Sequence, residues 1–141
     1  FLMGLSSIHW REAWKYGERA FRYCQHDIGH AWAALSISAS MLGWKAIILN
    51  TISDEAIAKL LGLNRLNDFE IEEKETPDLL AVIAPLKDTF KSDQSLKQES
   101  IQKIENGKWF GKANKLNDGY YPWDIIDRVS VACEKKNLIV I

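Results

Sequence analysis

A row of basic side chains recurs at helical spacing near the start of the chain. Its members follow one another at steps of four, three, four and four residues: Lys15, Arg19, Arg22, His26 and His30. On an unbroken helix they would share an arc of about 80°. Arg11 precedes Lys15 by four residues and extends the row. Two interpretations are open: Glu12, Glu18 and Asp27 neutralise the row on a solvated face, or the row lines a site for an anionic ligand or cofactor.

Two histidines of this row have a spacing that a metal ion can use. His26 and His30 lie at positions i and i+4, with Asp27 between them. The string resembles the His-Asp signature of HD-type phosphohydrolases, which complete a metal site with an upstream histidine and a distant aspartate. The upstream histidine here, His9, is close to the pair and poorly placed. We therefore assign no metal ligands and keep the metal phosphohydrolase as a minor alternative.

A longer string around the same row is more specific. It reads WREAWKYGERAFRY from Trp10 to Tyr23, followed by Gly-His-Ala at 29–31. This string resembles the SagB-type dehydrogenases of the nitroreductase family. Three further segments resemble the same family: 42–55, 60–63 and 109–127. The resemblance covers most of the chain and is closest between residues 10 and 63.

The resemblance implies an FMN-dependent oxidoreductase with an α+β fold, and an intertwined homodimer with the flavin at the dimer interface. In azoline-oxidising members a Lys-Tyr pair lies near the flavin, with the lysine as proposed general base, and Lys15-Tyr16 occupies that motif. A small-molecule or peptide substrate would exchange a hydride with the flavin. The predicted site consists of catalytic Lys15 and Tyr16 and of the cofactor-binding residues Arg11, Arg19, Arg22, Asn50 and Thr51.

The chain departs from the family at its N-terminal end. The family anchors the FMN phosphate with an arginine-rich, serine-containing motif, and residues 1–9 contain no arginine. Because the sequence begins with Phe1 rather than Met, we expect a single domain, residues 1–141, that is a fragment of a longer and possibly tandem protein. The anchor then lies upstream, comes from another domain, or has been lost. In the last case the alternative function is a flavin-free, non-catalytic domain that serves as a dimerisation or structural partner.

A long helix from about Glu18 to Leu42 is expected to position these residues. Its predicted core face recurs at steps of three and four: Phe21, Cys24, Ile28, Ala31, Trp32, Leu35, Ala39 and Leu42. From Ala31 onward the rest of its circumference is also small or apolar, which predicts burial on all sides. Gly17 is a candidate break before this helix, and Gly43 is its expected end.

The remaining segments predict a small sheet and shorter helices around that central helix. Strands are expected at 45–50 and 79–86, and a helix at 54–61 capped by Ser53 and ended by Gly62. A surface helix is expected within 92–106, with Leu96, Ile101 and Ile104 inward. A last helix at 122–136 would bury Trp123, Ile126, Val129 and Cys133, and a strand would begin at Leu138. This pattern predicts an α+β, nitroreductase-like layered domain.

Composition narrows the functional classes. The apolar fraction of 47% and the charged fraction of 26% are typical of a globular protein, and the net charge of −1 argues against broad nucleic-acid binding. Two cysteines, Cys24 and Cys133, do not form a disulfide framework, so buried thiols in a reducing, cytoplasmic compartment are expected. Serines, Gly43 and Lys45 interrupt the apolar run 31–49, which argues against a membrane span.

Overall fold

The structure is a computed structural model of the 141-residue chain and describes residues 1–70, 73–116, 119 and 121–136. The predicted strand from Leu138 lies outside the described residues. The elements in order are β1 (Leu2–Ser7), α1 (His9–Tyr16), the 3₁₀ helix η1 (Gly17–Arg19), α2 (Ala20–Met41), β2 (Trp44–Ile48), α3 (Asp54–Leu61), the 3₁₀ helix η2 (Leu66–Asp68), β3 (Thr76–Pro85), α4 (Gln98–Glu105) and α5 (Asp124–Ala132). The predicted α+β class is confirmed.

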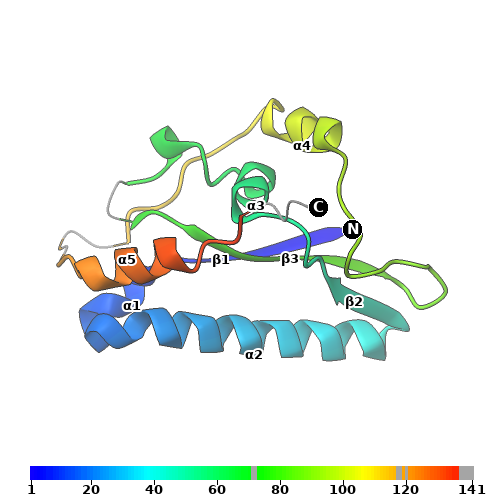
Figure 1. Cartoon of the computed structure of the whole chain (residues 1–141), viewed down its shortest axis with the longest axis horizontal. Coiled ribbons are helices and arrows are strands. Elements are labelled where there is room, and N and C mark those ends of the chain that lie inside the picture. Colours follow the sequence, from blue (N-terminus) through cyan, green and yellow to red (C-terminus); the bar gives the residue numbers. More distant parts are fainter. Residues whose placement is uncertain (71–72, 117–118, 120, 137–141) are drawn as a thin grey trace.

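Three antiparallel strands form one sheet in the order β1-β3-β2. Leu2 pairs with Val82 on one side of β3, and Ile47 pairs with the same residue on the other side. β1 was expected only as an extended segment, because it pairs with residues of β3 that lie 69 to 80 positions away in the sequence. Figure 1 shows α2 below this sheet and α3 and α4 above it.

The central strand is buried on both faces, which explains its continuous apolar sequence. Leu80, Val82 and Ala84 point to the α3 side, where they join the core cluster. The alternate residues 79, 81 and 83 are also buried and face the α2 side. A strand covered on both faces reads as an unbroken apolar run, so the prediction for 79–86 is confirmed with a start three residues earlier.

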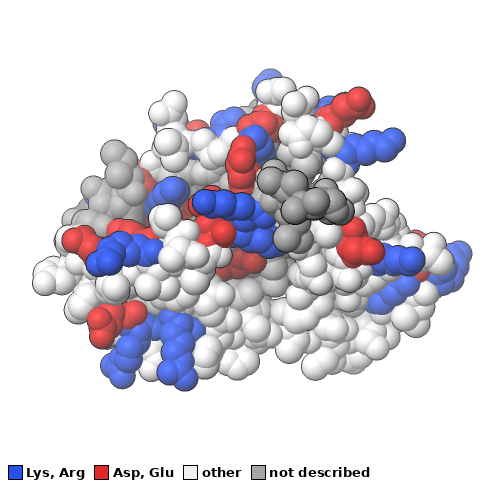
Figure 2. All heavy atoms as spheres, in the orientation of Figure 1, with Lys and Arg blue, Asp and Glu red and all other residues white. Residues whose placement is uncertain are grey.

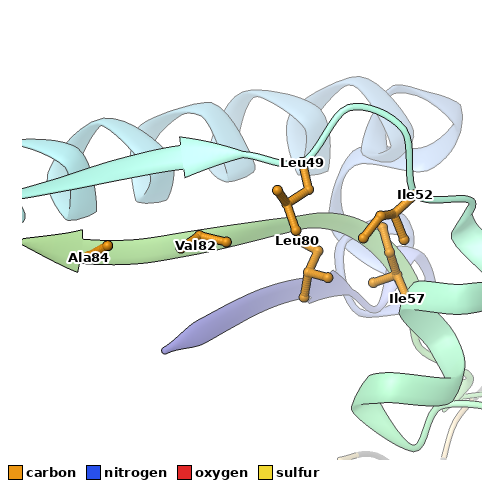
Figure 3. Close-up of a cluster of buried hydrophobic side chains, with 6 residues drawn as sticks. All are labelled: Leu49, Ile52, Ile57, Leu80, Val82 and Ala84. Carbon is orange, nitrogen blue, oxygen red and sulfur yellow. The ribbon is translucent and has the colours of Figure 1, made fainter. Parts of the chain in front are cut away.

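The main core lies between β3 and α3. Figure 3 shows its six buried side chains, which come from β3, from α3 and from the connection between β2 and α3: Leu49, Ile52, Ile57, Leu80, Val82 and Ala84. Three of these, Leu49, Ile57 and Leu80, are at most 1% exposed. This side of the sheet is therefore closed by the chain itself.

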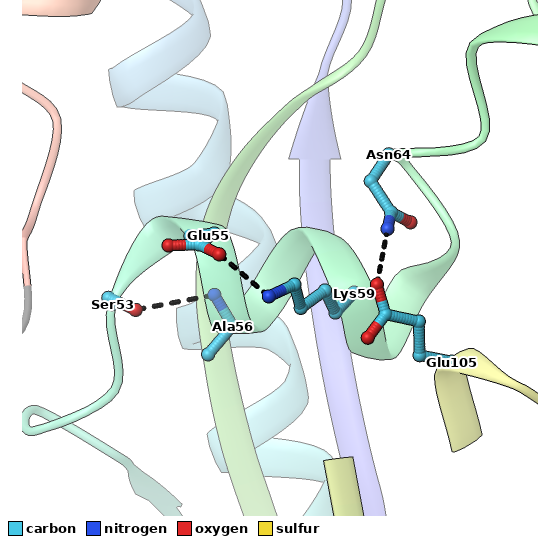
Figure 4. A network of polar contacts seen from close by, with 6 residues as sticks. All are labelled: Ser53, Glu55, Ala56, Lys59, Asn64 and Glu105. Atoms are coloured by element: carbon cyan, nitrogen blue, oxygen red, sulfur yellow. Dashed lines mark hydrogen bonds and ion pairs between the residues drawn. The ribbon is translucent and has the colours of Figure 1, made fainter. Parts of the chain in front are cut away.

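Local signals define α3 completely, as the sequence predicts. The Ser53 hydroxyl accepts a hydrogen bond from the Ala56 amide at 3.3 Å, and Gly62 ends the helix in the left-handed conformation at φ 74°. On its outer face Lys59 pairs with Glu55 at 2.6 Å. The Asn64 amide group donates to Glu105 at 2.8 Å and ties α3 to the end of α4 (Figure 4).

The predicted burial of α2 on all sides is wrong. The core face is largely confirmed, because Cys24 and Ala39 are buried and residues 21, 28, 32 and 35 are half-buried. The opposite side is exposed, as are Ala31 and Leu42 of the predicted core face: Ile37 is 62%, Leu42 72% and Met41 82% exposed. Only one layer, the sheet with α1 and α5, packs against this helix among the described residues.

Two further predictions need correction at the periphery. Cys133 is exposed, and α5 buries Ile126 alone, because α5 ends at Ala132 and leaves Cys133 in its C-cap. On α4, Ile101 is buried as expected, but Ile104 is 42% exposed. No described helix has the length and apolarity needed to cross a membrane.

Candidate functional site

The junction between α1 and α2 positions the predicted catalytic pair. Gly17 ends α1 with φ 58°, a backbone conformation that favours glycine, and its amide donates to the Ala13 carbonyl. A side chain at Gly17 would also lie 3.1 Å from the Trp123 ring. The predicted break at this glycine is confirmed. The chain therefore turns through η1 before α2 starts, so the basic row does not lie on one unbroken helix.

Lys15 and Tyr16 lie side by side at the end of α1. The Lys15 ammonium is 5.1 Å from the centre of the Tyr16 ring, within cation–π range, and Lys15 is exposed. Tyr16 is half-buried against the small core cluster of Ala13, Ala20 and Ile126. Its ring also packs on Tyr23 of α2, with centroids 4.6 Å apart at 55°. One side chain of the pair is therefore fixed by packing, and the other is free to reach a ligand.

The predicted cofactor-binding arginines surround this pair and are exposed. Arg11 lies on α1, Arg19 ends η1 and Arg22 lies on the first turn of α2. Within the described part of the chain, neither these arginines nor Lys15 forms an ion pair with a carboxylate. Asp27 instead lies 3.8 Å from His30. Figure 2 shows basic and acidic side chains near one another at the lower left, over α1 and the start of α2. Of the three acids expected to neutralise the row, Asp27 thus contacts its last member, His30, while Glu12 and Glu18 form no ion pair among the described residues.

The last two predicted residues lie elsewhere in the subunit. Asn50 and Thr51 follow β2, and the Thr51 hydroxyl donates to the Gln94 carbonyl at 3.3 Å. Figure 1 shows α1 at one end of α2 and β2 over the other half of that helix. One subunit therefore groups Arg11, Lys15, Tyr16, Arg19 and Arg22 at the base of α2 and keeps the turn after β2 apart from them.

One exposed face of α2 connects the two regions. We define the outer face of α2 as the exposed residues Arg19, Arg22, His26, His30, Ala34, Ile37 and Met41, which recur at steps of three and four. The face is basic at its start and apolar at its end. An exposed apolar strip with a polar border is typical of an interaction surface.

The histidine pair on this face lies on the surface of α2, with Asp27 3.8 Å from His30. His26 and His30 are exposed, and the described residues contain no group of three or more histidine, cysteine, aspartate or glutamate side chains that could hold a metal ion. The structure therefore gives no support to the metal phosphohydrolase.

A polar hollow beneath α5 was missed by the sequence analysis. His9 is 7% exposed, its ring lies 5.2 Å from Phe21, and its Nε2 atom has no hydrogen-bond partner among the described residues. Burial lowers the pKa of His9, and the nearby Asp127 offsets this in part. Asp78 accepts a hydrogen bond from Gln25 through Oδ1 at 3.2 Å, while its buried Oδ2 has no described partner.

Burial also dominates the titration of the acidic groups near this hollow. It raises the pKa of Asp78, and the neighbouring Ser7 and Gln25 side chains lower it only in part. Burial, together with the charges of Glu12 and Asp78, raises the pKa of the Cys24 thiol to about 11, so this thiol is a poor nucleophile. The one signal in the sequence was the histidine itself, placed between Ile8 and Trp10. In the structure it packs on Phe21 and lines a cavity together with residues of α5, more than 110 positions away.

Comparisons with known proteins add no relative. No family model matches the chain, and neither a curated protein nor a solved structure matches it.

Proposed function

We propose that this chain is a nitroreductase-like domain of an FMN-dependent oxidoreductase, related to the SagB-type dehydrogenases and part of a longer protein. The observation that carries the proposal is the unneutralised row of Arg11, Lys15, Arg19 and Arg22 beside the Tyr16–Tyr23 ring pair. Exposed cations suit a phosphate, and a tilted pair of aromatic rings suits contact with a planar group. These residues therefore fit the two ends of FMN.

A homodimer through the outer face of α2 follows from the same proposal. In a two-fold dimer the same patch is used on both subunits, so two α2 helices that pack antiparallel bury both apolar strips. In this arrangement each apolar strip packs against that of the partner, and the basic starts of the two helices lie at opposite ends of the contact. The role of Asn50 and Thr51 beside the flavin rests on the family resemblance, because within one subunit they lie apart from the basic row.

In the proposed reaction, each residue of the site would have a separate role. When bound, FMN supplies a two-electron acceptor for the hydride of the substrate carbon. Lys15 Nζ takes the proton from the adjacent substrate atom as a general base, so the hydride and the proton both leave the substrate. Tyr16, fixed by Ala13 and Tyr23, holds the substrate against the ring. Arg19 and Arg22 neutralise the phosphate.

A flavin-free, non-catalytic partner domain is the second candidate, and the exposed apolar strip of α2 favours it equally. Both candidates are consistent with a reducing, cytoplasmic location, because Cys24 and Cys133 are both free thiols. The two differ in whether the basic row holds a cofactor.

An absorbance spectrum taken after incubation with FMN and desalting distinguishes these functions. The oxidoreductase proposal predicts a retained flavin band of about one FMN per subunit, and a roughly tenfold loss of affinity in Arg22→Gln, equal to about 1.4 kcal/mol. Arg128→Gln, an exposed arginine on α5, is the matched control. A colourless dimer would favour the structural partner, and equal losses in both variants would show that the row is not the phosphate site.

A further inference from the structure

Two adjoining cavities lie beneath α5. One of about 310 Å³ is lined by α1, α5 and the aromatic residues Tyr121 and Trp123, and the other, of about 240 Å³, reaches α2 and the start of α3. They share His9, Thr76 and Ser130. We call them together the α5 hollow. The larger cavity alone is at the lower end of the range for small-molecule sites, about 300–1,000 Å³. The α5 hollow contains none of the residues of the proposed flavin site.

Two buried polar atoms at this hollow lack partners among the described residues. These are His9 Nε2 and Asp78 Oδ2, and both side chains line the smaller cavity. A buried polar atom without a hydrogen bond destabilises the folded state, so proteins seldom keep one without a use. An atom of a ligand or an ordered water would remove this cost.

The chemistry of the two atoms favours a hydrogen-bond donor with positive charge. An ionised Asp78 only accepts hydrogen bonds, and its burial is offset best by a nearby cation. A neutral His9 can accept a second hydrogen bond through Nε2, and an ammonium group carries three donors. Asp54 and Asp127 add negative charge at either end of the hollow, and Lys74 and Lys135 add positive charge at its rim.

The walls favour an apolar or aromatic body attached to that cation. Trp10, Trp123 and Tyr121 line the larger cavity, and the last two pack edge to face at 5.7 Å. Aromatic faces attract cations and pack well on planar groups. An anionic ligand would instead meet the carboxylates of Asp78 and Asp127.

We propose that the α5 hollow binds a small organic amine as its ammonium ion, which donates hydrogen bonds to Asp78 Oδ2 and His9 Nε2 while its apolar body packs on Trp10 and Trp123. The site is independent of the flavin site. It gives the domain a second ligand, whether or not FMN binds at the basic row.

Calorimetric titration of the full chain with benzylamine tests this directly, with benzoate and benzyl alcohol as matched probes of the same shape. Saturable binding of benzylamine alone, at one per subunit, is expected. The near-isosteric Asp78→Asn should weaken it at least tenfold, and His9→Gln should weaken it by a smaller factor. Glu99→Gln on the exposed face of α4 should leave it unchanged.

Three outcomes overturn the proposal. No saturable binding means that ordered water satisfies the two atoms. Preferred binding of benzoate means that Lys74 and Lys135 determine the chemistry of the hollow. Binding that Asp78→Asn does not change places the amine elsewhere. A repeat in the presence of excess FMN separates the two sites, since competition between FMN and benzylamine would place the amine at the basic row.

Discussion

The two sides of the sheet differ in how completely the chain covers them. On the α3 side, six side chains from β2, β3 and α3 close a core whose central residues are at most 1% exposed. On the other side, α2 covers the sheet with one face and leaves its outer face to solvent, although Ile37 and Met41 on that face are apolar. The first region is complete within one subunit. The second has the composition of a surface that is covered by something else.

This difference is also one of chemistry. The closed side is apolar and locally specified, whereas the α2 side holds the unneutralised basic row, the Tyr16–Tyr23 pair and the hollow with His9 and Asp78. Buried polar atoms without hydrogen-bond partners lower the stability of the folded chain. Because such atoms and the exposed basic row both lie on the α2 side of the sheet, we infer that this side carries the function.

The largest expected effect is on stability, and it contrasts two isoleucines. Ile57→Ala on the closed side should lower the free energy of unfolding by about 3 kcal/mol, because it leaves a cavity in a core with 0% exposure at that position. Ile37→Ala on the outer face of α2 should change the stability of the monomer by less than about 0.5 kcal/mol. Urea denaturation at low protein concentration measures both. Equal losses would show that the two sides do not differ as described.

The next effect concerns the basic row. Lys15→Ala should leave FMN binding nearly intact but slow substrate oxidation per bound flavin by about 10²-fold, the usual scale for a lost acid-base group. Stopped-flow reduction of the flavin by the best substrate from a screen of small molecules and peptides measures this rate. Lys103→Ala on exposed α4 is the control. Loss of flavin with unchanged turnover per bound flavin would make Lys15 a binding residue instead.

A charge on the apolar strip should weaken self-association. Met41→Glu should raise the dimer dissociation constant at least tenfold, because the glutamate would be buried without a partner in the interface. Gln102→Glu adds the same charge on exposed α4 and should leave association unchanged. Analytical ultracentrifugation over a concentration series compares the two. An unchanged constant in Met41→Glu would exclude the end of α2 from the interface.

A smaller effect is expected at the cap of α3. Ser53→Ala removes the side-chain acceptor for the Ala56 amide and should cost about 1 kcal/mol of unfolding free energy. Thermal denaturation would show it, with Ser100→Ala in exposed α4 as the control. No loss at Ser53 would mean that α3 is held by packing of Ile57 alone.

The smallest effect has the opposite sign. Burial raises the pKa of Asp78, so its ionised form lowers stability at neutral pH and Asp78→Asn should stabilise the chain. The difference should shrink as pH falls through the raised pKa, and vanish below the ordinary pKa of aspartate. His9 has a lowered pKa, so its protonation destabilises the wild-type chain and the variant alike in acid. The other charged groups that face the hollow, Asp54, Asp127 and Lys135, are also the same in both proteins. These contributions therefore cancel in the difference. Thermal unfolding from pH 7 downward measures the difference. A gap that widens in acid would contradict the assignment.

Local signals predicted the closed side well. Ser53, the periodicity of 54–61 and Gly62 define α3 within one segment of sequence, and the run 79–84 is buried on both faces as its continuous apolarity indicates. Gly17 likewise marks the end of α1 through its own backbone conformation. In each case the cause lies within a few residues of the effect.

The α2 side was predicted less well because its structure depends on distant contacts. Apolarity all round α2 shows what the helix could bury, but not how many neighbours reach it. β1 forms only because β3 pairs with it, and His9 packs on Phe21 of α2 and lines a cavity that α5 also lines. The basic row was found from its spacing, yet Asn50 and Thr51 lie apart from it in one subunit, which no pattern within the sequence could show.

Sedimentation velocity followed at the visible absorption band of FMN tests the central claim most directly, since it reports cofactor binding and assembly together. The account predicts that flavin sediments with a dimer at about one FMN per subunit, and that Met41→Glu shifts both flavin and protein toward slower species. Flavin that does not sediment with the protein, together with protein that sediments as a monomer, would contradict the account.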